Sequence, residues 1–196
     1  MSDIAAVLLA GGLSTRMGSS KAAAVWDGKP LVVHMAEVLC VVADPVIVVA
    51  AADQKLPPLP HGCEVAIDAE PEQGPLEAMS AGFRVAQGRG HEIFVAAVDL
   101  PLLRPEFVLA VVDRLDGAQA AVPVSNGHEH YLAAAYRREL QGLIEQLLVH
   151  GERRVGALVE QVPTNRFDVA ELPFPESLRN ANTADELESL RQLAGA

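Results

Sequence analysis

Two basic residues, Arg16 and Lys21, lie in the segment LLAGGLSTRMGSSK (8–21), which begins in the first apolar run of the chain. The glycines there have no Cβ, so backbone N–H groups can approach an anion closely. An arginine binds phosphate oxygens as a bidentate fork, and a lysine acts as a movable positive charge. The spacings G-x-x-x-x-G-K-[ST] and G-x-G-x-x-G are both absent. The two cations predict a polyphosphate site of another kind, whereas the glycines alone also fit a simple turn.

Two carboxylates are expected at one edge of a sheet. Asp99 follows the apolar run EIFVAAV (92–98), and Asp68 follows the short run EVAI (64–67). Ligands of open α/β sheets bind at the carboxyl ends of the strands. A carboxylate that faces a polyphosphate requires a cation between them, and Mg²⁺ is held by one or two carboxylates together with substrate phosphates. The sequence therefore predicts Mg²⁺ at Asp99; the alternative is that Asp99 only caps the helix beginning at Pro105.

Apolar runs alternate with helical patterns along the first half of the chain, which predicts an α/β fold. The sheet is expected to be open and mostly parallel, with helices on both faces. Continuous apolar runs stopped by glycine or proline indicate buried strands. The strands are expected at 4–10, 45–51, 64–67 and 92–98, and the helices at 30–43, 75–86 and 105–115.

The second half of the chain has a different pattern. The runs AQAAVPV (118–124) and HYLAAAY (130–136) flank Asn126-Gly127, which predicts an antiparallel hairpin. A helical stretch over 137–162 is broken at Gly151, a strand follows at 164–169, and Thr183-x-x-Glu186 is a capping box for a terminal helix. With no internal repeat and no long linker, residues 1–196 are expected to form a single domain.

Composition excludes some classes of partner. The formal net charge of −11 argues against nucleic acid and against anionic membranes. It does not exclude a small anionic ligand, because a metal ion can supply positive charge. Cys40 and Cys63 follow no disulfide pattern, no signal peptide is recognisable, and no apolar stretch approaches the roughly 20 residues of a membrane span. A cytoplasmic protein is therefore expected.

Six segments resemble the nucleotidyltransferases that activate molybdopterin, in the same order along the chain. The first segment is similar to that family's signature L-A-G-G-x-S-x-R-M-G-x-D-K. The other five are DGKPLVVHM, GPLEAM, VDLPLL, GERRVGALV and NANTADEL. The similarity runs from Leu9 to Leu187, nearly the whole chain. The combination resembles the molybdenum cofactor guanylyltransferases and implies a nucleotidyltransferase fold of the Rossmann type.

The resemblance implies a reaction and its partners. The terminal phosphate of molybdopterin would attack the α-phosphorus of GTP, with Mg²⁺ present, and pyrophosphate would leave. The N-terminal half would bind the nucleotide and the C-terminal half the cofactor. Apo-molybdoenzymes that receive the product and other cofactor-biosynthesis proteins are further candidate partners.

The resemblance also assigns roles to individual residues. Arg16, Lys21 and Asp99 would be catalytic, with Asp99 holding the metal. The second substrate would be bound by Arg153, Arg154, Asn180 and Asn182. The nucleotide would be bound by Leu9, Ala10, Gly11, Gly12, Lys21, Asp68 and Asp99.

Two departures from the family pattern bear on these roles. Ser20 stands where the family has Asp, which removes a carboxylate near Lys21, and Glu77-Ala78 replaces Ala-Gly near the nucleotide. The adjacent glycines of L-A-G-G favour guanylyl transfer, since cytidylyl relatives tend to have L-A-A-G. A cytidylyltransferase for the same cofactor or for another phosphorylated small molecule, and a nucleotide-binding regulator without turnover, remain the alternatives.

Some motifs admit a plainer interpretation. Without a third ligand at metal spacing, His128-Glu129-His130 is interpreted as a solvated hairpin tip rather than a zinc site. The run 152–154 also fits a charged helix start, and Asn180 and Asn182 also fit turns or caps.

Overall fold

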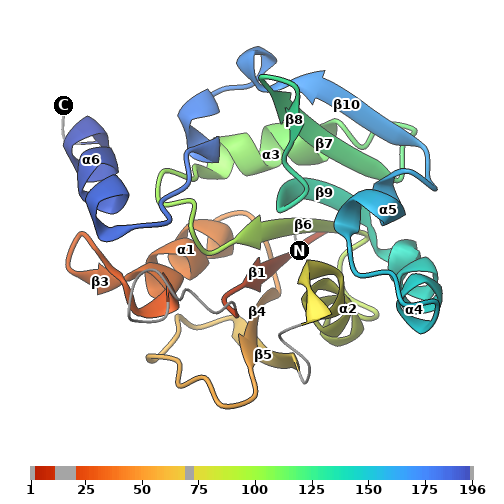
Figure 1. The fold of residues 1–196 in the computed structure, drawn as a ribbon, viewed down its shortest axis with the longest axis horizontal. Helices are drawn as coiled ribbons and strands as arrows, with labels where there is room; N and C mark the ends of the chain where they lie inside the picture. The colour runs from red at the N-terminus through yellow and green to blue at the C-terminus, as the bar shows by residue number, and fades with distance from the viewer. Residues whose placement is uncertain (1–2, 12–20, 69–72, 195–196) are drawn as a thin grey trace.

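A mixed sheet forms the centre of the protein in this computed structural model, which describes residues 3–11, 21–68 and 73–194. Its strand order is β10-β7-β9-β6-β1-β4-β5, with β8 paired to β7. Helices α1 and α3 cover one face of the sheet, and α2, α4 and α5 cover the other (Figure 1). The α/β class with helices on both faces, predicted from the sequence, is confirmed.

The main elements follow one another in the order expected from the hydrophobic runs. The strands are β1 (Ile4–Leu9), β2 (Val25–Trp26), β3 (Lys29–Pro30), β4 (Val46–Ala51), β5 (Cys63–Asp68), β6 (Glu92–Ala97), β7 (Ala120–Ser125), β8 (His128–Glu129), β9 (Ala133–Arg137) and β10 (Thr164–Asp168). The α-helices are α1 (Leu31–Cys40), α2 (Pro75–Val85), α3 (Pro105–Asp113), α4 (Gln141–Val149), α5 (Val155–Val159) and α6 (Ala184–Ala194). The 3-10 helix η1 (Lys21–Ala23) precedes β2, and η5 (Pro175–Leu178) precedes α6.

The central strand β1 is buried on both faces, as its unbroken apolar sequence predicts. Alternate side chains point to opposite faces of a strand. Ala6 and Leu8 therefore join the core beneath α1 and α3, whereas Val7 and Leu9 join the core beneath α2 and α4. Parallel pairing with both β4 and β6 fixes β1 in the middle of the sheet.

The second half contains the predicted antiparallel pair, with an additional short strand after its turn. Asn126 and Gly127 both have positive φ, 50° and 74°, as a two-residue hairpin turn requires. The turn joins β7 to the short β8, and the run expected to pair across it forms β9, which is antiparallel to β7 as predicted and also antiparallel to β6. A second hairpin, β2–β3, turns at Asp27-Gly28, also with positive φ, and its D-G signal was missed in the sequence.

The terminal helix α6 begins as the capping box predicts. The backbone N–H of Glu186 donates to Thr183 Oγ1 at 3.1 Å, and the Glu186 carboxylate accepts from the backbone N–H of Asn182 at 2.6 Å. Gly151, with φ of 83°, separates α4 from α5 as expected. Within the described ranges, every helix is too short or too polar to cross a membrane.

Helix α2 contacts the sheet at a glycine, which gives a test of the packing. A Cβ on Gly82 would lie 2.4 Å from Val7 Cγ1 and 3.2 Å from Val49 Cγ2. We expect Gly82→Ala to lower the free energy of unfolding by about 1–2 kcal/mol, because overpacking outweighs the gain of up to ~1 kcal/mol in helix propensity. Denaturant unfolding measures this change.

Gly142→Ala is the matched control for that substitution. Gly142 is also helical, in α4, and an added Cβ would meet no heavy atom within 4 Å. The control should therefore stabilise the protein by up to about 1 kcal/mol. Equal and stabilising effects of both substitutions would contradict the close approach of α2 to β1.

Candidate active site

The carboxyl ends of four parallel strands lie at one edge of the sheet, in the order β5-β4-β1-β6. The register pairs Leu9 of β1 with Ala97 of β6, two residues before Asp99. It pairs Asp68 of β5 with Ala51, which lies two residues beyond the β4 partner of Leu9. Asp68 ends β5 and Asp99 lies in the turn after β6, and these two strands are three inter-strand spacings or about 14 Å apart. The two carboxylates share one edge, but they are too far apart to share one ion.

The segment after β6 is held by contacts from three other parts of the chain. The backbone N–H of Ala181 donates to the carbonyl oxygen of Asp99 at 2.9 Å. His34 of α1 lies with its Nε2 2.9 Å from the carbonyl oxygen of Pro101, and Ser177 Oγ donates to that of Leu102 at 3.3 Å. Ser177 is fully buried. These contacts fix Asp99 and bring the segment that carries Asn180 beside it.

A cavity of about 640 Å³ opens beside Asp99, at the ends of β6 and β9. Three residues predicted from the sequence line it: Asp99, Arg154 and Asn180. β1 lies on the opposite side of β6 from β9, so Asp99 stands between the cavity and the β1-β4-β5 edge. The structure thus brings together side chains that lie up to 81 residues apart in the sequence.

Most of the lining residues were not assigned to the site from the sequence, including one continuous polar run. The run from His128 to Tyr131 forms part of the cavity wall. The HEH motif was interpreted as a solvated hairpin tip, and His128 itself is exposed. β8 and the segment after it, however, lie against the cavity, and His130 and Tyr131 are only partly exposed. No local sequence signal indicates this position, because it depends on how β7 and β9 enter the sheet.

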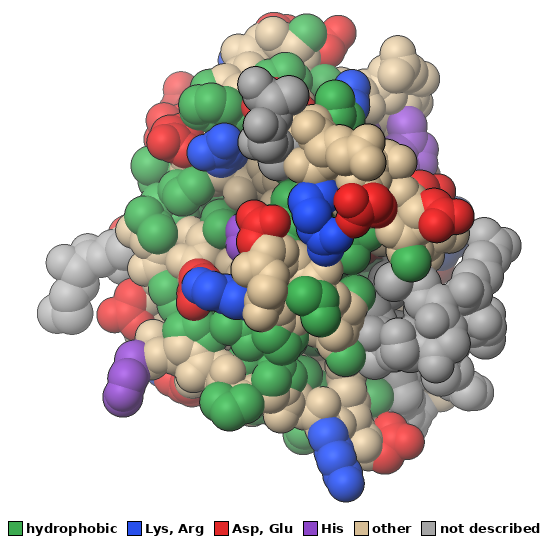
Figure 2. Space-filling model, turned by 90° about the vertical axis from the view of Figure 1, so that its left-hand side faces the viewer, with side chains coloured by type: hydrophobic (Ala, Val, Ile, Leu, Met, Phe, Trp, Pro, Cys, Tyr) green, Lys and Arg blue, Asp and Glu red, His purple; other side chains and the backbone are tan. Residues whose placement is uncertain are grey.

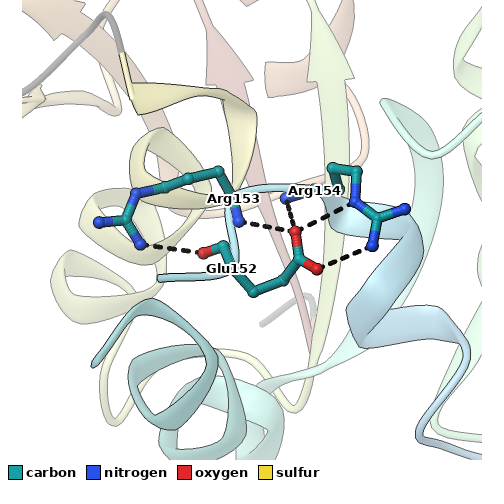
Figure 3. Close-up of polar contacts among 3 residues, drawn as sticks. All are labelled: Glu152, Arg153 and Arg154. Carbon is teal, nitrogen blue, oxygen red and sulfur yellow. Dashed lines mark hydrogen bonds and ion pairs between the residues drawn. The ribbon is translucent and has the colours of Figure 1, made fainter. Parts of the chain in front are cut away.

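The side chains of Arg153 and Arg154 extend to opposite sides of Glu152 (Figure 3). The Glu152 carboxylate accepts from the backbone N–H groups of both arginines, at 2.8 and 2.9 Å, and from Nη2 of Arg154 at 2.8 Å. These hydrogen bonds, that of the Arg154 side chain foremost, lower the pKa of Glu152 to about 2. The turn therefore keeps its anion at neutral pH, and the two guanidinium groups point in opposite directions.

Arg153 points toward α2 rather than into the cavity. Its Nε donates to Gln73 Oε1 at 2.7 Å, and its Nη1 donates to the carbonyl oxygens of Leu148 at 2.8 Å and Glu152 at 3.0 Å. Its own carbonyl oxygen accepts from the backbone N–H of Leu76 at 3.3 Å. Arg153 therefore joins the end of α4 to the start of α2, a structural role, whereas Arg154 lines the cavity.

The two arginines should consequently respond differently to the same substitution. Arg153→Met is expected to lower the free energy of unfolding by about 1–3 kcal/mol, because it leaves partly buried acceptors unpaired. Arg154→Met is expected to leave the unfolding midpoint unchanged, because that side chain is 72% exposed and its ion pair with Glu152 is solvated. Thermal unfolding of both variants checks this. An equal loss of stability in the two would contradict their separate roles.

The β1 side of the edge contains the residues expected to meet the nucleotide. The carbonyl oxygen of Leu9 accepts from the backbone N–H of Val98 at 3.2 Å, and that of Ala10 accepts from Gln54 Nε2 at 3.0 Å. Gln54 Oε1 also accepts from the backbone N–H of Ala51 at 3.1 Å. Each carbonyl retains a second lone pair. The Gln54 carboxamide, which the sequence did not single out, therefore ties the ends of β1 and β4 together.

Some predicted site residues are not placed in the site. Gly12 and Arg16 lie outside the described residues, and Lys21 begins η1 without a described side chain. The backbone of Asn182 caps α6, and Asn182 is not among the described residues that line the cavity. The roles of these residues remain predictions.

The donor set at Asp99 fits Mg²⁺ better than a metal that needs a protein cage. No group of three or more His, Cys, Asp or Glu side chains that could hold a metal occurs among the described residues. A closed zinc site takes four protein ligands, whereas Mg²⁺ takes one or two carboxylates and obtains its other oxygens from phosphates and water. Asp99 would supply this carboxylate at the mouth of the cavity.

Figure 2 views the molecule from the side toward which the β1 and β6 arrows point in Figure 1. On this face, hydrophobic side chains are interspersed with separate charged ones, and several basic side chains lie beside acidic ones. The described part of this face therefore carries charge in small groups rather than as one basic surface.

The fold is that of solved nucleotidyltransferases. Molybdopterin-guanine dinucleotide biosynthesis protein A from Archaeoglobus fulgidus matches with a TM-score of 0.79, over 97% of this chain and 98% of that chain, at 20% identity. The 2-C-methyl-D-erythritol 4-phosphate cytidylyltransferase of Thermus thermophilus matches with a TM-score of 0.74, over 97% and 98%, at 16% identity. At these identities the likeness shows the fold alone.

The sequence comparisons define the family. Residues 6–165 match the model of the MobA-like NTP transferase domain. A Mycobacterium tuberculosis protein named probable molybdenum cofactor guanylyltransferase is 38% identical over 193 residues, which cover 96% of this chain and 94% of the relative. The chain therefore belongs to the family of MobA-like NTP transferase domains and is a nucleotidyltransferase, which confirms the resemblance in the sequence.

Proposed function

We propose that the protein transfers GMP from GTP to the terminal phosphate of molybdopterin, forming molybdopterin guanine dinucleotide and releasing pyrophosphate. A bond forms between a phosphate oxygen of molybdopterin and the α-phosphorus of GTP, and the bond between the α- and β-phosphates breaks. The similarity to curated guanylyltransferases supports this choice of substrates. The N-terminal half would bind the nucleotide and the C-terminal half the cofactor.

The position of Asp99 is the observation that carries the proposal. It lies between the β1-β4-β5 edge and the cavity lined by Arg154 and Asn180. A nucleotide with its base or ribose near Asp68 and its phosphates near Asp99 would span the roughly 14 Å between β5 and β6. Its α-phosphate would then face a second substrate in the cavity.

The chain's own residues would align and neutralise the reactants. Arg16 and Lys21 would bind phosphate oxygens, and Asp99 would hold Mg²⁺. When bound, Mg²⁺ supplies positive charge to the phosphate oxygens and to the leaving pyrophosphate. No general base is required, because the attacking phosphate is already ionised at neutral pH. Catalysis would rest on positioning and on electrostatic stabilisation.

Lys21→Ala is expected to lower turnover by more than about tenfold, because a desolvated phosphate contact contributes a few kcal/mol. Lys55→Ala is the matched control, since Lys55 is exposed in the loop between β4 and β5. Steady-state pyrophosphate release measures both. A loss no larger than that of the control would show that Lys21 does not bind the phosphates.

Cytidylyl transfer to the same cofactor is the second candidate. The shared fold with a cytidylyltransferase supports it, whereas the L-A-G-G sequence favours guanylyl transfer. Pyrophosphate release with molybdopterin and each of the four NTPs decides between them. Release with GTP alone is expected, and release with CTP alone would move the cytidylyl candidate to first place. We further place the reaction in the cytoplasm, with apo-molybdoenzymes as candidate recipients of the product.

A further inference from the structure

One wall of the cavity is formed by β8 and the segment that joins it to β9. His128, His130 and Tyr131 line the cavity there, together with the apolar side chain of Leu132. The carbonyl oxygen of Tyr131 accepts from Tyr136 Oη at 2.8 Å, and Tyr136 is fully buried in the core. This hydrogen bond therefore anchors the wall to the core beside the sheet.

The His130 ring is held in one orientation by contacts with residues of β7 and β8. Its Nε2 lies 2.6 Å from Ser125 Oγ, and its backbone N–H donates to the carbonyl oxygen of Pro123 at 2.9 Å. The His128 ring packs edge-to-face against it, with centroids 5.1 Å apart and planes at 89°. A ring restrained in this way binds a ligand with little further loss of rotamer entropy.

Charged and neutral groups both line the cavity. Asp99 and Arg154 provide charges that a phosphate and its metal ion would contact, and Glu129 and Glu160 also line the cavity. Burial and the neighbouring His128 lower the pKa of His130, so its imidazole is neutral at neutral pH. A neutral imidazole with a partly buried apolar surround suits the edge of an uncharged heterocycle better than a phosphate.

Resting on the proposed function, we propose that His130, oriented by Ser125 and packed against His128, binds the pterin ring of the second substrate. The phosphate of that substrate then lies toward Arg154 and Asp99. This arrangement directs the terminal phosphate to the sheet edge, where the nucleotide phosphates are expected. His130 is thus a specificity-determining residue for the heterocycle, and Ser125 is the residue that positions it.

Kinetics of single variants test this orientation. His130→Ala is expected to raise the KM for molybdopterin about tenfold, the effect of losing one well-placed hydrogen bond, with the KM for GTP unchanged. His130→Gln should recover part of the loss, because it keeps a hydrogen-bonding group, and Ser125→Ala should show a smaller increase. His150→Ala, at the end of α4 and outside the cavity lining, is the matched control. Thermal unfolding verifies that each variant is folded.

A second measurement separates this inference from the proposed function. Free pterin-6-carboxylate, which lacks the phosphate of molybdopterin, is titrated against the whole protein by fluorescence. Binding should be weakened up to about tenfold by His130→Ala and left unchanged by the control His150→Ala. Absence of turnover with any NTP would overturn the proposed function but not this binding result. Equal pterin binding by wild type and His130→Ala, or an unchanged KM for molybdopterin, would overturn the inference.

Discussion

Asp99→Asn is expected to lower turnover by roughly three orders of magnitude while the protein remains folded. The substitution is nearly isosteric but removes the charge that would hold Mg²⁺ beside the phosphates. The backbone contact of residue 99 is preserved, because its carbonyl oxygen accepts from Ala181 whatever the side chain. Pyrophosphate release at saturating GTP and molybdopterin, over a titration of Mg²⁺, measures the effect.

Asp113→Asn is the matched control for this loss. Asp113 is exposed at the end of α3, outside the cavity lining, so its variant should retain wild-type turnover. Excess Mg²⁺ should restore Asp99→Asn only slightly, since the amide oxygen is a weaker ligand than a carboxylate. Wild-type turnover of Asp99→Asn in saturating Mg²⁺ would place the metal site elsewhere.

GTP is expected to be preferred over CTP by at least about 100-fold in kcat/KM, the discrimination that results when buried polar groups are left unpaired. Guanine presents N1–H and N2–H₂ donors, which require acceptors such as carbonyl oxygens. Leu9 and Ala10 offer such oxygens at the end of β1, each with one lone pair already used by Val98 or Gln54. Cytosine would direct its N3 lone pair at the same oxygens. Competition between the two nucleotides in one assay measures the ratio.

Gly11→Ala should reduce that preference, because it converts L-A-G-G to the L-A-A-G pattern of cytidylyl relatives. An added Cβ at Gly11 would lie 3.4 Å from the backbone nitrogen of Ala51, an ordinary contact, so the fold should tolerate it. A change in nucleotide choice therefore reports on the base site rather than on folding. Equal use of CTP and GTP by the unmodified protein would make the guanylyl assignment wrong.

Hydrophobic periodicity predicted the layered fold, because a parallel strand that is buried on both faces is apolar at almost every position. Ile4–Leu9 is apolar throughout because helices cover both of its faces. The antiparallel pairing of β7 with β9 was predicted, but the short β8 was not. Asn126-Gly127 specifies that the chain reverses, but local turn chemistry does not show that β9 also pairs with β6. β9 enters between β6 and β7 through long-range packing, which no window of sequence encodes.

The residue types of the site were predictable, but the direction of individual side chains was not. Arg153 and Arg154 are adjacent and chemically alike, and both were assigned to the second substrate. The partner that turns Arg153 away is Gln73, 80 residues earlier in the chain. His130 was not assigned to the site for the converse reason, since only the tertiary position of the segment between β8 and β9 brings it to the cavity. Long-range geometry thus decides which of several plausible polar residues face a ligand.

Following the α-phosphate of GTP tests guanylyl transfer most directly. Purified protein, Mg²⁺ and molybdopterin are incubated with GTP labelled at the α-phosphorus, and the products are separated and identified by mass. The label should appear in a molybdopterin guanine dinucleotide, with one pyrophosphate released for each dinucleotide formed and no transfer without molybdopterin. Label recovered only as free GMP, or only in unreacted GTP, would contradict the assignment of this chain as a guanylyltransferase.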